Sequence, residues 1–456
     1  MNTKIKVPLL AIGVSALIGT GCKKDDPKTN IIFILADDFG WAQTGVYGSD
    51  YYHTPNIDHL AAEGMRFTNA YAACSVSSPT RASIMTGKYP ARLHLTDFIA
   101  GNNREDYPLS QPDWQKFLPL EEVTLAEVIK EQGYKTAIFG KWHLSITKFG
   151  PESLQYNPDK QGFDQHFVID KPDRKITNPE YDPHKSDSIG NTSVKFIREN
   201  ADNPFFLFVS FSAVHNPLME KSDSINWWKN VAGSDKEENN PVIAAILSRM
   251  DRNIGKILEA VDQSKLASNT MVVFFSDNGG LGSDAKQTPL REGKGWLYEG
   301  GIRVPLIIRW PGVVKKGSVS SENVSSIDFM PTFCDLLNVK NKPNVDGISI
   351  LSHLKTGVPL PERNLYWHYP HYHNGPPSGA IRSGKWKLIE WYENSLLETG
   401  KPAYELYDLE NDISESVNLA DSMKTLTMKL SGELQRWREN VNAQMPFPNA
   451  KYTVID

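Results

Sequence analysis

The chain has 456 residues, of which 40% are hydrophobic and 23% charged, and its formal net charge at pH 7 is -5. This length exceeds what one hydrophobic core usually serves, so we expect a large domain with a smaller one attached. The composition excludes wholesale disorder and a multi-pass membrane protein, and the negative charge argues against nucleic acid as a partner.

The first residues have the layout of a secretory signal. Lys4 and Lys6 precede an apolar run over residues 7–18, and small residues lead to Cys22. The run is too short to span a bilayer comfortably. We predict a signal peptide over residues 1–21, export to the periplasm or cell surface of a Gram-negative bacterium, and a lipid on Cys22 as the only attachment to the membrane. Ordinary cleavage that frees the protein in the periplasm stays open, because the residues before Cys22 match the lipoprotein pattern imperfectly.

After a tether over residues 22–29, apolar runs alternate with helical patterns. The runs are bounded by polar, Gly or Pro residues, as expected of strands buried on both faces of a sheet. Strands are predicted at Asn30–Ala36, Lys135–Phe139, Pro204–Ser210, Thr270–Phe275 and Val304–Arg309. Helices are predicted at Asn56–Ala62, Thr124–Glu131, Val242–Val261 and Ser326–Leu337. This order predicts an α/β fold with a large central, mostly parallel mixed sheet flanked by helices.

The composition of the sequence changes after residue 350. Aromatic-rich segments are followed by an amphipathic helical pattern near Met423–Asn440. The aromatic segments are Leu365–Tyr372, Lys385–Trp391 and Tyr404–Tyr407. We therefore predict a catalytic domain over residues 30–350 and a smaller C-terminal subdomain over residues 351–456, built from an antiparallel sheet and a helix.

The most specific motif begins at Ser77. It reads Ser77-Ser78-Pro79-Thr80-Arg81 and continues to Thr86-Gly87. Ser77 or Ser78 can cap a helix whose first turn tolerates Pro79. The unpaired N–H groups and the dipole at a helix start favour an anion. Taken alone, the motif also fits a capped surface helix that contains a polar turn.

Two pairs of oxygen-bearing side chains follow predicted strands. Asp37 and Asp38 come after Asn30–Ala36, and Asp277 and Asn278 come after the strand that begins at Thr270. Ligands of open α/β sheets bind outside the carboxyl ends of the strands. Adjacent carboxylates repel one another unless a cation lies between them, and an all-oxygen site suits a hard cation such as calcium better than zinc. Either pair alone would more simply be a turn former.

Lysine and histidine side chains occupy comparable positions. Lys141 and His143 follow the strand at Lys135–Phe139, His215 follows the next strand, and Lys294 lies in a Gly-rich segment. An isolated lysine or packed histidine is usually inert. Their shared placement with the carboxylates indicates one charged site at the edge of the sheet.

The motif at Ser77 resembles the signature of the type I sulfatases of the alkaline phosphatase superfamily, in which a Cys or Ser is followed by Pro and then by Arg. Cys74 does not fit, because Val76 stands where Pro is required. The resemblance implies that a radical maturase oxidises Ser77 to formylglycine (3-oxoalanine) without oxygen. One hydroxyl of the hydrated aldehyde then attacks sulfur, and the other later expels the sulfate. A serine that replaced a natural Cys would bind substrate without turnover, and this alternative stays open.

The resemblance also implies a role for each site residue. Calcium is bound by Asp37, Asp38, Asp277, Asn278 and residue 77. The sulfate is held by Arg81, Lys141 and Lys294. His215, together with Lys294, protonates the leaving sugar oxygen, His143 assists release of sulfate from residue 77, and Asp277 takes the proton of the attacking hydroxyl.

Two polar-aromatic stretches fit a sugar ring, since ligand pockets combine apolar walls with a few polar anchors. The residues predicted to bind substrate are Asn103, Arg104, His368, His371 and His373. The same aromatics could instead pack the two domains together. The composition of these stretches resembles that of sulfatases acting on galactose or N-acetylgalactosamine sulfates, so the expected partner is a sulfated saccharide.

Two other functions remain open from the sequence. A phosphate or phosphonate monoester hydrolase of the same superfamily would share the sheet and the aspartates. A surface glycan-binding lipoprotein whose centre is never matured would keep the fold without catalysis.

Overall fold

The computed structural model describes residues 1, 3, 28–102, 106–145, 151–169, 182–397 and 399–452. Cys22, Asn103 and Arg104, and nearly all of the predicted signal segment, lie outside the described residues. Across the described ranges no helix has both the length and the apolar character needed to cross a membrane.

The strands of the described chain fall into one large sheet, one sheet of intermediate size and two short pairs. In chain order they are β1 (Asn30–Ala36), β2 (Met65–Phe67), β3 (Ala70–Tyr71), β4 (Leu109–Ser110), β5 (Lys135–Gly140), β6 (Gln165–Val168), β7 (Phe205–Ser210), β8 (Thr270–Ser276), β9 (Leu306–Arg309), β10 (Ser318–Ser320), β11 (Val324–Ser325), β12 (Asn364–Tyr369), β13 (Ser378–Ser383), β14 (Trp386–Trp391), β15 (Tyr404–Asp408) and β16 (Phe447–Pro448).

Helices connect these strands. In chain order the α-helices are α1 (Pro55–Ala62), α2 (Ser77–Thr86), α3 (Pro90–Leu93), α4 (Leu125–Glu131), α5 (Ser186–Glu199), α6 (Ser222–Lys229), α7 (Pro241–Gln263), α8 (Glu299–Ile302), α9 (Phe329–Leu336), α10 (Leu351–Thr356), α11 (Tyr392–Leu397) and α12 (Lys424–Asn440). Short 3-10 helices lie at Gly45–Tyr47, Pro151–Tyr156, Pro158–Lys160, Ala267–Asn269 and Ser326–Asp328.

The large sheet has eight strands within the described chain, in the order β10-β2-β9-β8-β1-β7-β5-β6. Its central strand β1 pairs in parallel with β7 and β8. The side chains of β1 alternate between two cores, with Phe33 in one and Ile34 in the other, so burial on both faces explains the continuous apolar run. β9 is antiparallel to β8. The predicted α/β fold with a mostly parallel mixed sheet is confirmed.

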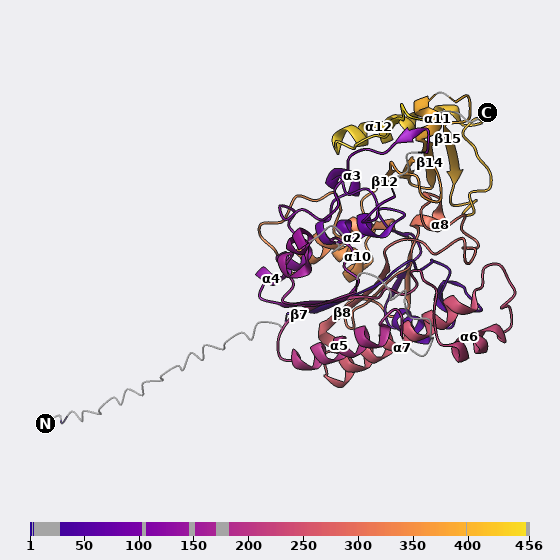
Figure 1. Cartoon of the computed structure of the whole chain (residues 1–456). Coiled ribbons are helices and arrows are strands. Elements are labelled where there is room, and N and C mark those ends of the chain that lie inside the picture. The colour runs from indigo at the N-terminus through magenta and orange to yellow at the C-terminus, as the bar shows by residue number, and fades with distance from the viewer. Residues whose placement is uncertain are drawn as a thin grey trace.

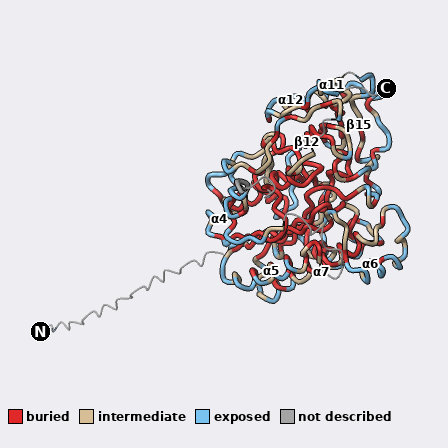
Figure 2. The backbone as a smooth tube through the Cα atoms, viewed as in Figure 1, coloured by how far each residue is buried: buried red, intermediate tan, exposed pale blue. Residues whose placement is uncertain are grey.

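The helices cover both faces of this sheet. Figure 1 shows α5 and α7 on one side and α2, α4 and α10 on the other. α7 begins where Asn240 Oδ1 accepts hydrogen bonds from the N–H groups of Val242 and Ile243, with Pro241 at the first helical position. The buried tube at the centre of Figure 2 marks the two cores between the sheet and its helices.

The C-terminal part contains the antiparallel sheet β12-β13-β14-β15, against which α12 packs. The predicted antiparallel sheet with a helix is therefore confirmed. The sheet shares its core with the main domain, because Leu365 and Trp367 of β12 lie in one cluster with Tyr71 and Leu297. α10 lies beyond residue 350 but packs into the main core through Leu354, so the structural change to the smaller sheet comes after α10.

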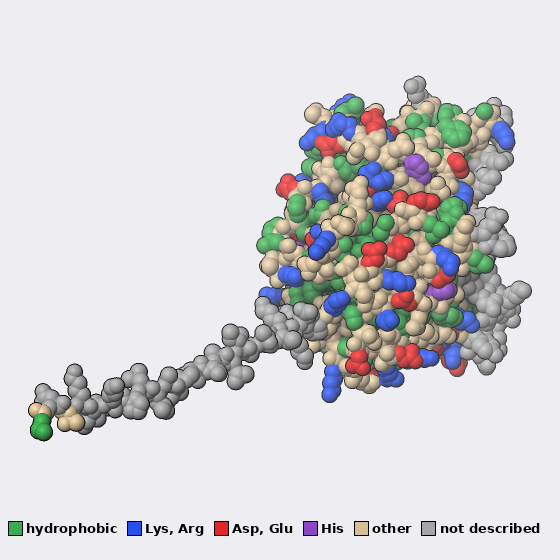
Figure 3. Space-filling view, turned by 90° about the vertical axis from the view of Figure 1, so that its left-hand side faces the viewer, with side chains coloured by type: hydrophobic (Ala, Val, Ile, Leu, Met, Phe, Trp, Pro, Cys, Tyr) green, Lys and Arg blue, Asp and Glu red, His purple; other side chains and the backbone are tan. Residues whose placement is uncertain are grey.

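Charged side chains are spread over the surface. On the face seen in Figure 3, basic and acidic groups are interspersed, and no continuous basic patch is visible.

Candidate active site

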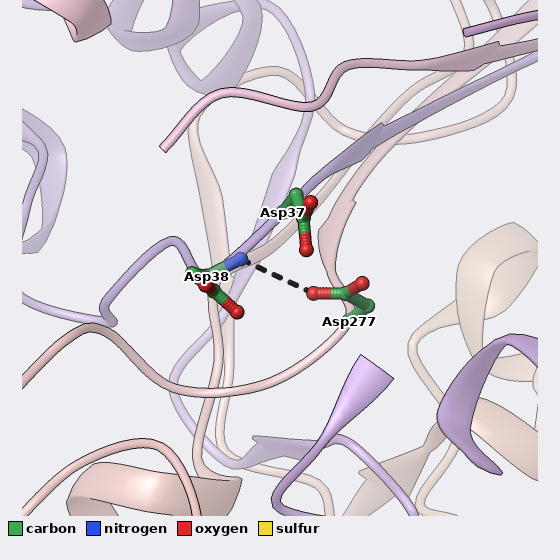
Figure 4. Close-up of side chains that lie close together, drawn as sticks. All are labelled: Asp37, Asp38 and Asp277. Atoms are coloured by element: carbon green, nitrogen blue, oxygen red, sulfur yellow. Dashed lines mark hydrogen bonds between the residues drawn. The ribbon is translucent and has the colours of Figure 1, made fainter. Parts of the chain in front are cut away.

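Three carboxylates converge at the carboxyl ends of β1 and β8. Oxygens of Asp37, Asp38 and Asp277 all lie within 4.8 Å of one another, and Figure 4 shows the three side chains pointing toward a common centre. The backbone N–H of Asp38 donates to Asp277 Oδ1 at 3.2 Å. Asn278 Nδ2 donates to Asp38 Oδ1 at 2.8 Å. The parallel register of β1 and β8 brings both pairs together, although they are far apart in the sequence.

Ser77 is the first residue of α2, and its side chain is 1% exposed. The prediction that Ser77 or Ser78 caps this helix was wrong, because Val76 is the N-cap residue and no side chain caps the helix. Ser78 Oγ instead accepts a hydrogen bond of 3.0 Å from the N–H of Ile99. Ser77 Oγ therefore lies among the unpaired N–H groups of the first turn, where anions are favoured.

His143 is positioned as an acceptor for the residue 77 hydroxyl. Its Nδ1 lies 2.8 Å from Ser77 Oγ, and its Nε2 contacts the carbonyl oxygen of Ile99. A carbonyl can only accept, so Nε2 carries the hydrogen and Nδ1 has the free lone pair. Burial, Lys141 and Arg81 hold the pKa of His143 well below its usual value, which keeps this ring neutral.

Lys141 links Ser77 to the carboxylates. Its Nζ lies 2.7 Å from Asp37 Oδ2 and 3.5 Å from Ser77 Oγ. Gly140 precedes it with φ +113°, and a Cβ there would lie 1.8 Å from the carbonyl oxygen of Ser210. Only glycine fits at this position, so the turn that brings Lys141 into the site depends on it.

Arg81 lies behind the carboxylates. Its Nε and Nη2 are each 2.8 Å from Asp277 Oδ2, and its Nη1 donates to the carbonyl of Lys141 and to Ser210 Oγ. The guanidinium is 2% exposed. Through these contacts Arg81 positions Asp277 and Lys141, and the predicted direct contact with sulfate stays a prediction.

Lys294 and His215 also lie beside the carboxylates. Lys294 Nζ donates to Asp38 Oδ2 at 2.8 Å. His215 Nδ1 lies 2.7 Å from the carbonyl of Asn216 and so carries a hydrogen. Burial, Lys141 and Lys294 lower the pKa of His215 to about 4. The structure thus brings Ser77, the two acidic pairs and all the predicted cationic and histidine groups into one region.

The charges of the site balance without an added ion. Burial alone would raise the pKa of Asp37, but Lys141, His215 and Arg81 hold it well below its usual range. Burial also opposes ionisation of Asp38, where Lys294 lowers the pKa. Burial and the neighbouring Asp37 raise the pKa of Asp277 to about 7. Three carboxylates face Arg81, Lys141 and Lys294, so an added dication would leave the pocket net positive.

The oxygen set fits a hard divalent cation. Oδ1 of Asp37 and Oδ1 of Asn278 are buried, and neither has a hydrogen-bond partner among the described residues. An unpaired buried acceptor is costly. A cation that prefers carboxylate and amide oxygens would satisfy both atoms together with Asp38 and Asp277.

Several contributing residues were not predicted from the sequence. Ser210 holds Arg81 and donates to the carbonyl of Lys141 at 2.6 Å. Ser276 Oγ accepts from the N–H of Phe39 and donates to the carbonyl of Asn278. Ser210 and Ser276 are the last residues of β7 and β8. Polar residues that end buried strands were the signal that could have identified them.

Two of the histidines predicted to bind sugar do not fit that role. His368 Nδ1 contacts the hydroxyl of Tyr392, and its Nε2 contacts the carbonyl of Gln444. His371 is 1% exposed, and its two ring nitrogens contact Thr96 and Gln111. Because every ring nitrogen already has a protein partner, these side chains hold the loops in place.

The third histidine lies at the site. A Cβ built on Gly295 would come within 2.3 Å of His373 Nδ1, and neighbouring Asn374 donates to the carbonyl of Lys294 at 2.7 Å. The ring of Phe98 lies edge-on to His373, with centroids 5.5 Å apart. His373 is therefore next to Lys294, and its contact with substrate stays a prediction.

Asp97 gives a prediction for stability. Burial raises its pKa to about 7, despite hydrogen bonds from Tyr369 and from the N–H of Phe98. The native state therefore binds this proton more tightly than the unfolded chain, so stability falls as pH rises from about 4 to about 7. Over this pH range the free energy of unfolding of Asp97→Asn should fall by less than that of the wild type, with a difference on the order of 1–3 kcal/mol. Urea unfolding at a series of pH values measures it.

The control for this prediction is the exposed Asp421→Asn. It should keep the wild-type dependence of the free energy of unfolding on pH. If Asp97→Asn keeps that dependence as well, Asp97 titrates normally in the folded protein.

Comparison with known proteins gives the family. The family model described as "Sulfatase" matches residues 29–339, and the model "N-sulphoglucosamine sulphohydrolase, C-terminal" matches residues 293–440. A protein named "Sulfatase" from Formosa agariphila is 31% identical, with 96% of this chain and 94% of the relative covered. "N-acetylgalactosamine-6-O-sulfatase" from Bacteroides thetaiotaomicron is 28% identical, with 95% and 99% covered.

A solved structure agrees. The crystal structure of Ps i-CgsB in complex with k-i-k-neocarrahexaose superposes with a TM-score of 0.76 at 30% identity, with 93% of this chain and 95% of that chain covered. The family match over residues 29–339 takes in every segment that builds the acidic centre and the start of α2. A match over that much of the chain shows that the protein belongs to the sulfatase family and is a sulfatase.

Proposed function

We propose that this sulfatase removes sulfate from a sulfated saccharide, with calcium and a formylglycine formed at position 77. The observation that carries the proposal is the position of Ser77 Oγ, which lies 2.8 Å from His143 Nδ1 and 3.5 Å from Lys141 Nζ. Lys141 in turn contacts the carboxylate centre through Asp37. A plain serine is a weak nucleophile there, whereas an oxidised and hydrated side chain has hydroxyl groups for attack and release.

The saccharide is supported by the relatives. One of them is named for N-acetylgalactosamine 6-O-sulfate, and another was solved with a neocarrahexaose. His373 and Phe98 provide a polar group and a ring beside Lys294, which suits a sugar. We propose a galactose or N-acetylgalactosamine sulfate as substrate.

The residues of the chain divide the work of the reaction. Asp37, Asp38, Asp277, Asn278 and residue 77 would hold the calcium, which would supply positive charge for an anionic substrate. Lys141 and Lys294, each of which donates to a carboxylate of the centre, hold the sulfate. Asp277 takes the proton of the attacking hydroxyl, and His143 Nδ1, which lies 2.8 Å from Oγ of residue 77, accepts the proton of the hydroxyl that expels the sulfate. Lys294 Nζ carries protons and donates to the leaving oxygen; His215, whose Nδ1 hydrogen is bonded to the Asn216 carbonyl, shares in this donation once its Nε2 is protonated.

The rival function is hydrolysis of phosphate or phosphonate monoesters. A dinuclear zinc centre needs further histidine and aspartate ligands in addition to one cluster of carboxylates. Within the described residues one group of three metal-binding side chains is found, and it consists of Asp37, Asp38 and Asp277. An all-oxygen cluster next to Ser77 favours the sulfatase reaction.

A substrate panel tests the proposal. Protein produced together with a serine-oxidising radical maturase should release sulfate from at least one singly sulfated galactose or N-acetylgalactosamine, measured by ion chromatography. Turnover of the matching phosphate esters should be at least about 100-fold slower, which corresponds to roughly 3 kcal/mol in the transition state. Faster release of phosphate than of sulfate would support the rival function instead.

We also propose that the protein is exported and carries a lipid on Cys22. Support comes from Lys4, Lys6 and the apolar run over residues 7–18. Metabolic labelling with a fatty acid, compared between the wild type and Cys22→Ala, tests the anchor.

A further inference from the structure

A second pocket opens on the surface of the main domain, between the start of α1 and helices α6 and α7. It has a volume of about 410 Å³ and is lined by His53, Asn56, Trp227, Trp228 and Arg252, among others. None of these residues belongs to the catalytic centre. Figure 1 shows α6 and α7 on the side of the large sheet opposite α2.

Aromatic rings form one wall of this pocket. Trp227 is 57% exposed, and none of the other tryptophans, all of which the structure describes, is exposed. Its ring stands edge-on to that of Trp228, with centroids 4.8 Å apart and planes at 88°. His53 packs against Trp228 at 5.1 Å. Trp228 is itself 3% exposed, and its carbonyl accepts a hydrogen bond from Tyr51. The exposed ring of Trp227 therefore packs against a buried side chain, Trp228, that is itself held in place.

A cationic group borders the rings. The side chain of Arg252 is 59% exposed, and its closest ion-pair partner is Asp187, at 3.9 Å. At that distance the guanidinium keeps its donors for a ligand. A planar guanidinium binds the oxygens of a sulfate or carboxylate in pairs. Ser224 and Ser248 also line the pocket.

We propose that this pocket is a second saccharide-binding site, in which a sugar ring stacks on Trp227 and an anionic substituent of the same chain contacts Arg252. A large rigid ring with a polar surround binds the apolar face of a pyranose. The choice of a sulfated saccharide as ligand rests on the proposed function. This site binds sugar units of a long saccharide that are distant, along the saccharide, from the sulfate ester that is cleaved.

A larger cavity near the C-terminal sheet also contains a tryptophan, but a lysine covers that ring, so a sugar cannot stack on it. That cavity has a volume of about 660 Å³ and contains Trp386. Lys385 lies over the Trp386 ring, 4.7 Å from its centroid, and is held by Asp408 at 2.6 Å. Glu322 and Glu362 also line this cavity and would repel sulfate, whereas the carboxylate that lines the pocket at Trp227, Asp251, is buried and accepts hydrogen bonds from Asn56 and Ile57. Stacking of a sulfated saccharide is therefore expected at Trp227.

Affinity electrophoresis tests the site in full-length Ser77→Ala protein, which binds without turnover. The gels contain carrageenan, chondroitin sulfate or uncharged dextran. Trp227→Ala should weaken retention by at least one of the sulfated polysaccharides about tenfold, the effect expected for loss of one stacked ring. Arg252→Gln should weaken the same retention. Val417→Ala, which also removes an exposed apolar side chain (58% exposed), should change nothing.

Kinetics separates this site from the catalytic proposal. In matured protein, Trp227→Ala should raise the KM for the retained polysaccharide and leave kcat/KM for 4-nitrophenyl sulfate unchanged. Retention that depends on Trp227 without any release of sulfate would mean that the proposed function fails and the binding site stands. Retention independent of Trp227 overturns the site. A change in oligomeric state on size-exclusion chromatography of Trp227→Ala would also overturn it, because the pocket would then contact a second copy.

Discussion

Ser77→Ala should abolish sulfate release, with a fall in kcat of at least about 10⁴-fold, in the range known for loss of a catalytic nucleophile. The hydroxyl at position 77 lies next to both an imidazole acceptor and a cation, since His143 Nδ1 and Lys141 Nζ flank it. Alanine has no oxygen to oxidise, so no attacking group can form. Sulfate release by the purified variant, compared with the wild type at saturating substrate, measures the effect.

The matched control is Ser75→Ala. Ser75 is as buried as Ser77, at 0% exposed, and lies in the same segment, but its hydroxyl makes no hydrogen bond to His143 or Lys141. This variant should keep turnover within a few-fold of the wild type, with a similar Tm. If Ser77→Ala turns over as fast as Ser75→Ala, residue 77 is not the nucleophile.

Asp277→Ala should abolish both turnover and the response to calcium. Asp277 is fully buried, forms an ion pair with Arg81 and accepts a hydrogen bond from the N–H of Asp38. Its loss therefore removes a carboxylate from the centre and leaves the buried guanidinium of Arg81 without its carboxylate partner. We expect kcat to fall by at least about 10³-fold, or roughly 4 kcal/mol. In the wild type, calcium should raise Tm, because an ion that binds the folded state stabilises it. The variant should show no such rise in a calcium titration.

Asp328→Ala is the control for a lost buried carboxylate. Asp328 is also fully buried and is paired with an arginine, Arg363, but it is not one of the three carboxylates of the cluster. Its loss should lower Tm by a comparable amount because it too leaves an arginine unpaired. Its Tm should still rise with calcium. A calcium response that survives in Asp277→Ala but not in Asp328→Ala would place the cation elsewhere.

The central strands could be predicted because burial on both faces leaves a simple pattern. β1, β5, β7 and β8 are continuous apolar runs, and each was predicted within a residue or so of its bounds. The acidic pairs were recognisable because they follow such runs directly. β13 and α5 were missed. The adjacent small residues Gly379 and Ala380 weaken the pattern of β13, and α5 buries Ile189, Phe196 and Ile197 among mostly polar residues.

Side-chain orientation could not be predicted from the sequence. His368 and His371 lie in a stretch that is rich in polar and aromatic residues, yet burial and hydrogen bonds from distant segments turn both rings inward. Arg81 lies in the motif, but the close approach of Asp277 and Ser210 places it behind the centre. Each outcome depends on contacts between residues far apart in the sequence, which spacing does not encode.

The most direct test of the account is mass spectrometry of the peptide that contains residue 77, from protein produced with and without the radical maturase. Oxidation of Ser77 makes the peptide lighter by two hydrogens. We predict that sulfate release rises in proportion to the oxidised fraction and is absent from the unmodified protein. Full sulfatase activity in a preparation whose residue 77 is entirely unmodified serine would contradict the central claim.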